Sequence, residues 1–195
     1  VQQKQERIDQ LRQKLEGATC SETYDINYGL FEEYQSFRYD SAYFYANRSL
    51  ELAGQMNDQD KMVRSRCAVV FCYMSSGLFL EAFDEMKKVD ARNASLQVKK
   101  EYYSLYNRLY YDASDFNDTE NWSAEYTRMG TLYADSLMSI VPKESYDYIF
   151  AVAQSEVKHW HYSQCIDFYK QLLDEHTVST HNKAIINSSI GGAYK

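Results

Sequence analysis

Small residues recur along the chain at nearly constant spacing, each within a stretch that has the apolar periodicity of an amphipathic helix. Ala42, Ala82, Ala124 and Cys165 are separated by 40, 42 and 41 positions. After most of them, apolar residues follow at i+4 and at i+7 or i+8, the spacing of a buried helical stripe with one point of close helix contact. The repeat therefore predicts a solenoid of helix pairs, each pair about 41 residues long.

The same pattern predicts the limits of the helical segments within a single repeat domain. A capping helix is expected over about residues 2–16, with Ile8, Leu11 and Leu15 on its apolar stripe. Helical hairpins are expected over residues 22–54, 59–90, 96–140 and 144–175, followed by an incomplete further repeat over 181–195. Residues 112–122, rich in Asp, Asn, Ser and Thr, are expected to form a long loop.

The second hairpin carries a resemblance to the tetratricopeptide repeat. Its segment "CAVVFCYMSSGLFLEAF" places Val70, Gly77 and Ala82 where that family has a helix, a tight turn and a second helix. The period exceeds the family's usual length of about 34 residues, and no repeat ends in the family's usual proline. The resemblance implies an all-α fold, a right-handed αα-superhelix of tetratricopeptide-like hairpins.

A second resemblance is strongest over about residues 4–55. The segments "QERIDQLRQKL" and "LFEEYQSFRYDSAYFYANRSLELA" are similar to the N-terminal region of a bacterial family of membrane-anchored regulators. That family resembles proteins with an exported sensor region, a transmembrane helix and a cytoplasmic DNA-binding module. The resemblance implies a periplasmic location and a regulatory role, and it carries no catalytic residue to this chain.

Aromatic residues are more numerous than a small core needs, because every buried tyrosine hydroxyl also requires a hydrogen-bond partner. The chain has 19 tyrosines, so we expect some rings to line a concave groove formed by the first helix of each hairpin. The predicted groove residues are Phe31, Tyr34, Phe71, Met74, Tyr103, Tyr106, Tyr110, Phe150 and Val157. The alternative is that these rings only pack between hairpins.

Charge and hydropathy exclude some classes of partner. A net charge of −7 opposes direct binding to the phosphates of nucleic acids or to anionic membranes. The longest apolar run, Cys67–Met74, is far shorter than the roughly 20 residues that span a bilayer. Membrane attachment would therefore come only through a segment downstream of this sequence. The four cysteines are expected to be free and mostly buried, which favours a reducing compartment.

The sequence offers weak candidates for catalysis or metal binding. His159 and His161, near Cys165, would point about 200° apart on one helix and could not chelate one ion together. No phosphate-binding glycine loop and no nucleophile elbow are found along the sequence. We predict no catalytic residue, no metal and no cofactor.

Two functions of different classes remain open. The leading hypothesis is a non-catalytic sensor domain that binds a peptide, a glycan or a partner protein, with a homodimer as one further arrangement. The alternative is a cytoplasmic scaffold that joins two proteins, and an enzyme comes third. Residues 181–195 carry an apolar stripe that includes Ile186 and Ile190, so we also expect the parent protein to continue beyond this segment.

Overall fold

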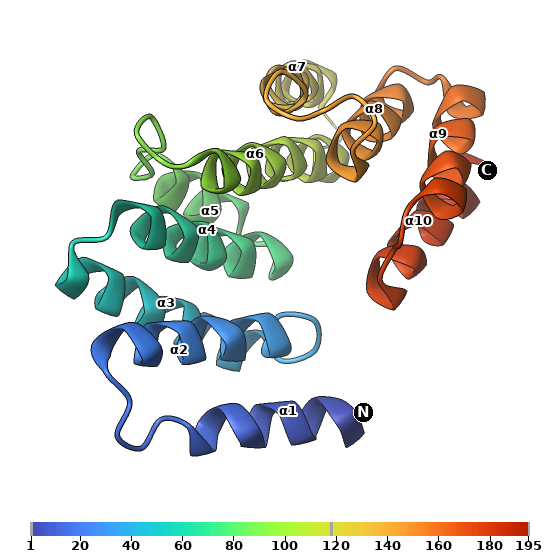
Figure 1. Cartoon of the computed structure of the whole chain (residues 1–195). Helices are drawn as coiled ribbons and strands as arrows, with labels where there is room; N and C mark the ends of the chain where they lie inside the picture. The colour runs from blue at the N-terminus through green and yellow to red at the C-terminus, as the bar shows by residue number, and fades with distance from the viewer. Residues whose placement is uncertain (1, 118, 195) are drawn as a thin grey trace. The chain divides into compact units, whose positions relative to one another are not determined.

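The computed structural model of the chain describes residues 2–117 and 119–194, which form helices and the connections between them (Figure 1). The helices are α1 (Gln2–Gln13), α2 (Cys20–Tyr34), α3 (Tyr39–Met56), α4 (Gln59–Ser75), α5 (Phe79–Met86), α6 (Leu96–Phe116), α7 (Glu120–Met138), α8 (Tyr146–Lys158), α9 (Tyr162–Glu175) and α10 (Thr180–Ala193). The all-α prediction is confirmed. Each predicted hairpin range overlaps one pair of these helices, and the first pair extends two residues beyond its range at each end.

The chain divides into two compact units, residues 1–102 (unit 1) and residues 103–195 (unit 2). The boundary falls inside α6, whose first seven residues belong to unit 1. Each unit has a hydrophobic cluster of its own. The expectation that the whole chain is a single domain stays a prediction.

Local interactions set the helix ends in unit 1. Thr19 caps α2 in a capping box with Glu22, in which each side chain binds the other residue's backbone N–H. Gly77 ends α4 with a φ of 75°, in the left-handed region that glycine enters without steric cost. The next N–H, that of Leu78, donates to the Tyr73 carbonyl at 2.9 Å, which completes a Schellman turn.

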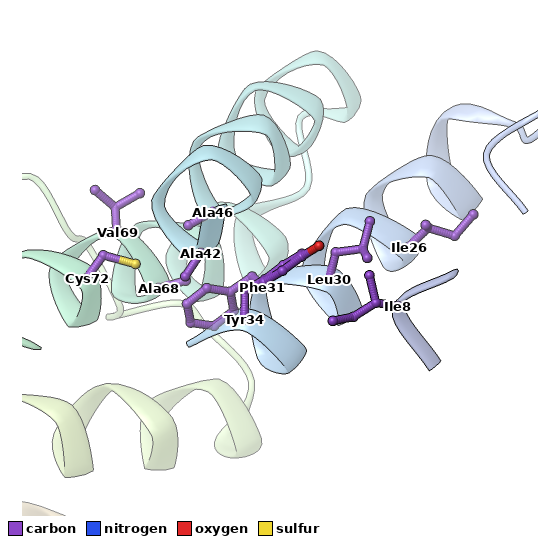
Figure 2. Packing of buried hydrophobic residues seen from close by; sticks show 10 residues of the cluster. All are labelled: Ile8, Ile26, Leu30, Phe31, Tyr34, Ala42, Ala46, Ala68, Val69 and Cys72. Atoms are coloured by element: carbon purple, nitrogen blue, oxygen red, sulfur yellow. The ribbon is translucent and has the colours of Figure 1, made fainter. Parts of the chain in front are cut away.

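Small residues lie at the points where the helices of unit 1 approach one another. Ala42 and Ala46 of α3 are fully buried, and so is Ala82 of α5. Figure 2 shows Phe31 and Tyr34 of α2 beside the two α3 alanines, within one hydrophobic cluster. The burial predicted for the repeating small residues is therefore confirmed at the first two of the four positions.

Helix α1 packs on α2 through the stripe predicted from the sequence. Ile8 is fully buried, and Leu11 and Leu15 pack partly buried against the same cluster. At the edge of this contact, Arg7 donates two hydrogen bonds to the Glu33 carboxylate, at 2.6 and 3.0 Å. Because both groups are planar, this bidentate pair restricts the angle at which Arg7 meets Glu33.

The aromatic residues of α2 and of the turn that follows it are paired with cations from neighbouring helices. The Lys61 ammonium lies 4.3 Å from the centre of the Tyr24 ring, and the Arg64 guanidinium lies 4.6 Å from the centre of the Tyr28 ring. Two further pairs join Lys4 to Phe37 and Arg12 to Tyr34, at 5.0 and 5.9 Å. These cation–π contacts hold α1 and α4 against α2, so part of the aromatic excess is structural.

Three of the four free cysteines are buried and unreactive. Burial raises the pKa of Cys67 and Cys72 to about 12 and the pKa of Cys165 to about 11. These thiols therefore stay protonated and pack as small apolar side chains. Cys20, at the start of α2, is exposed.

In unit 2, α8, α9 and α10 share one hydrophobic cluster. Cys165 of α9 is fully buried, as the repeat predicts. Leu172, two turns further along the same stripe, is also fully buried. Helix α10 contributes Ile186 to this cluster, while Ile185 of the same helix and its C-cap residue Tyr194 are exposed. Helix α10 thus packs through one face.

The long loop expected over residues 112–122 is wrong. Helix α6 continues to Phe116 and α7 begins at Glu120, which leaves only a short connection. One of the polar residues that suggested a loop, Ser114, instead bonds across the helix pair, with its hydroxyl 2.7 Å from that of Thr127. Side-chain hydrogen bonding across a helix pair is a tertiary interaction that composition does not reveal.

The predicted contact residue of the third hairpin is also wrong. Ala124 is exposed, and the close approach occurs at buried Gly130 of the same helix. A Cβ on Gly130 would lie 2.5 Å from Cδ1 of Tyr111, because the tyrosine ring packs directly on the glycine backbone. The Asn107 amide donates to the Gly130 carbonyl at 3.0 Å and fixes the same contact.

This contact predicts that Gly130→Ala destabilises the chain. The Tyr111 ring is buried and its hydroxyl lies 3.3 Å from that of Thr131, so it cannot move aside easily. We expect overpacking to cost about 1–3 kcal/mol, measured by urea denaturation. The control is Gly191→Ala in α10, where nothing lies within 4 Å and alanine should stabilise the helix by up to about 1 kcal/mol. Equal midpoints for the two variants would contradict the contact.

Candidate functional site

The four groove residues predicted in unit 1 lie against its hydrophobic core. Phe31, Tyr34 and Met74 are buried, and Phe71 is partly buried. The Phe31 ring meets the Phe71 ring edge-on, with 6.2 Å between their centres. These side chains join α2 to α4, and their contact with a ligand stays a prediction.

Three of the predicted groove residues, all tyrosines of α6, come together in unit 2 around Tyr133 of α7. The ring centres of Tyr103, Tyr106 and Tyr110 lie 6.4, 4.7 and 5.6 Å from the Tyr133 ring centre. Tyr110 and Tyr133 are stacked, with 13° between their planes. The cluster joins α6 to α7, and a ligand role for it also stays a prediction.

The last two predicted groove residues, both on α8, have different surroundings. The Phe150 ring stacks on Tyr146, with centres 5.6 Å apart, and lies 5.9 Å from the Tyr169 ring of α9. Val157 lines a pocket that lies entirely within unit 2. Of the nine predicted residues, Val157 is the one that the structure places in this pocket.

The pocket in unit 2 has a volume of about 1050 Å³ and is lined by residues of α6, α7, α8, α9 and α10. This volume lies just above the range of ordinary ligand sites, about 300–1,000 Å³. Aromatic rings lie alongside hydroxyl groups, an amide and charged groups in its lining. Such a mixture suits binding and orientation of a sizeable ligand more than the chemistry of a few atoms.

A charge network forms one part of the pocket lining. The Lys158 ammonium donates to the Tyr111 carbonyl at 3.2 Å and also contacts the Asp115 carboxylate. The Lys158 side chain is only 12% exposed, whereas that of Asp115 is 72% exposed. Burial raises the pKa of Asp112 next to them, and Arg108, 3.3 Å away, opposes that rise. In the pair of Lys158 and Asp115, the Asp115 carboxylate is therefore the group that a ligand can reach.

Hydroxyl groups of α6 and α7 form another part of the lining. The Ser114 hydroxyl lies 2.7 Å from that of Thr127 and 3.0 Å from that of Ser123. The Thr131 hydroxyl donates to the Thr127 carbonyl at 3.0 Å. These groups are therefore bonded to one another and to the backbone before any ligand arrives.

An exposed tryptophan lines the pocket at the turn between α8 and α9. Trp160 is 78% exposed and has a φ of 63°, a left-handed conformation that is unfavourable for a bulky residue. Its N–H donates to the Val157 carbonyl at 3.1 Å, and the next N–H, of His161, donates to the Glu156 carbonyl at 2.9 Å. The turn thus repeats the bonding of the Gly77 turn with tryptophan in place of glycine.

The sequence analysis did not predict a role for Trp160, because the histidines on either side of it are the residues that suggest a metal site. The His159 and His161 rings lie with centres 6.4 Å apart, and the second pairs with Glu156 at 2.7 Å. Among residues 2–117 and 119–194, no group of His, Cys, Asp and Glu side chains is arranged to hold a metal ion. The signal was available, since the hairpin pattern aligns Trp160 with Gly77.

The turn predicts that Trp160→Gly stabilises the free chain. The left-handed conformation costs a non-glycine residue roughly 1–2 kcal/mol, and the exposed indole gains little from packing in return. After allowance for the flexibility of glycine in the unfolded state, we expect a gain of about 1 kcal/mol in unfolding free energy. The matched control, Gly77→Ala in the equivalent turn, should lose a similar amount. A loss of stability in Trp160→Gly would contradict the account.

The sequence family described as the SusR N-terminal TPR domain, where TPR is the tetratricopeptide repeat, matches residues 1–195. No curated protein matches the chain. The family match and the helix pairs together confirm the predicted tetratricopeptide-like fold.

Proposed function

The chain belongs to the family of SusR N-terminal TPR domains, and from this premise we propose that it is a non-catalytic recognition domain for a peptide, a glycan or a partner protein. Domains of the tetratricopeptide type are typically binding modules. One observation carries the proposal: the unit 2 pocket is lined by an exposed tryptophan that the backbone holds in an unfavourable conformation. Such strain is a recognised feature of binding and catalytic sites.

The pocket is organised to bind without rearrangement. Its hydroxyls and its ion pair are already fixed by mutual contacts, such as those of Ser114 with Thr127 and of Lys158 with Asp115. A ligand therefore does not have to order these side chains, and the entropic cost of binding is lower. The mechanism is recognition alone, with no bond made or broken.

We extend the proposal to signalling and location. Support comes from the family's description as an N-terminal domain and from the resemblance of residues 4–55 to exported sensor regions of membrane-anchored regulators. The domain would then lie in the periplasm as part of a transcription regulator. Ligand occupancy can switch such a protein only if the ligand binds its two states with different affinity. Of the helices in the described residues, none is long and apolar enough to cross a membrane.

A second candidate function is a cytoplasmic scaffold that joins two proteins. The free cysteines favour it, because an exposed thiol such as Cys20 persists more readily in a reducing compartment. In that case the partner surfaces would be protein, and no small ligand would be sensed.

Blocking the pocket tests the recognition function. Ala124 is exposed on α7 and lines the pocket, so Ala124→Trp should fill part of it without disturbing the core. On combined peptide and glycan arrays, we expect the unmodified chain to bind and Ala124→Trp to bind about tenfold less tightly or worse. The control, Ala184→Trp, changes an exposed alanine of α10 outside the lining and should bind normally. Equal binding by both variants would exclude the pocket.

The exposed thiol provides a test of location in cells that make the full-length protein. Cys20 is exposed, whereas Cys67, Cys72 and Cys165 are buried. A membrane-impermeant maleimide should therefore label Cys20 in spheroplasts before lysis, and the Cys20→Ser variant should lose that label. Labelling that requires lysis would contradict a periplasmic domain and favour the scaffold.

A further inference from the structure

We infer that the unit 2 pocket takes an extended peptide segment in which a proline packs on Trp160 and a basic side chain pairs with Asp115. The inference rests on the proposed function, since it names the ligand class of the same pocket. It is supported by two aromatic rings of the pocket, by the hydrogen bonds among the hydroxyls of the lining, and by the positions of the charged side chains.

The rings of Trp160 and Tyr162 form an open aromatic corner. They are 78% and 37% exposed, their centres lie 6.0 Å apart, and their planes are nearly perpendicular at 82°. Aromatic-lined grooves of this kind bind the polyproline II conformation, in which the proline ring packs against aromatic faces. That conformation is largely formed before binding, so a rigid pocket loses little affinity to ordering the peptide.

The polar lining suits a ligand group that brings hydrogen-bond donors. The hydroxyls of Ser114, Ser123 and Thr127 are bonded to one another, and the Thr131 hydroxyl donates to the backbone. Because their protons are used in these bonds, the hydroxyls have few donors left to give but keep lone pairs that can accept. A lysine or arginine side chain brings donors and no acceptor. The lining therefore favours a basic side chain beside the proline.

Charge in the pocket favours a basic neighbour for the proline. The Lys158 ammonium is nearly covered and bound to the Tyr111 carbonyl, while the Asp115 carboxylate is mostly exposed. Arg128, the other cation of the lining, donates two hydrogen bonds to Glu125 at 2.6 and 2.8 Å. A cationic ligand group thus meets an open carboxylate, and the net charge of −7 attracts it at longer range.

A random 12-residue peptide library displayed on phage, selected on the immobilised 195-residue chain, tests the inference. We expect the bound peptides to be enriched in proline together with arginine or lysine. Trp160→Gly should weaken binding of a selected peptide about tenfold or more, and Asp115→Asn should remove the preference for the basic residue. The control Trp122→Ala changes a second exposed tryptophan, outside the pocket lining, and should leave binding unchanged.

The outcomes separate this inference from the proposed function. Enrichment without proline, or binding that survives Trp160→Gly, overturns the inference. If no peptide is enriched but the chain binds immobilised glycans and Ala124→Trp abolishes that binding, the recognition function stands and the peptide class is wrong. If neither peptides nor glycans bind, both the inference and a peptide- or glycan-binding pocket are overturned.

Discussion

Close approach of helices at fully buried small residues is the constraint on which the rest of the structure depends. Helices pack with their axes about 8–10 Å apart, and the shorter distances require small side chains at the crossing. Ala42, Ala82 and Cys165 occupy such positions, and each is fully buried. Once the crossings are fixed, the larger rings and their cationic partners can pack around them. The left-handed conformation of Trp160 is set by the tight turn between α8 and α9, the two helices that cross at Cys165.

The sequence was informative wherever a small residue and its helix stripe coincide, and it failed where the contact involves the backbone. Periodicity predicted the helices around Ala42 and Ala82 because the small contact residue and the apolar residues that follow it lie on one stripe of the helix. In the third hairpin the contact is made by Gly130, whose backbone supports the Tyr111 ring. A ring that packs on a glycine backbone does not change the apolar periodicity, so the repeat spacing points to Ala124 instead.

The pocket was harder to predict because five helices contribute to it and no single stretch contains it. Among the predicted groove residues, Phe31 packs in the core of unit 1, and Val157 lines the pocket. The excess of tyrosine was an ambiguous signal, since rings such as that of Tyr28 are held by a cation from another helix, α4. Trp160 could be inferred only by aligning its turn with that of Gly77, where glycine shows which backbone conformation the turn needs.

The central claim is that a ligand occupies the pocket of unit 2 while unit 1 is held together by its own core. Hydrogen exchange of the free and ligand-bound chain, measured by mass spectrometry on peptides that cover both units, tests it most directly. The account predicts that a ligand identified on the arrays slows exchange in residues 123–132 and 154–162, which line the pocket. Slower exchange confined to α2 and α4, with no change in unit 2, would contradict it.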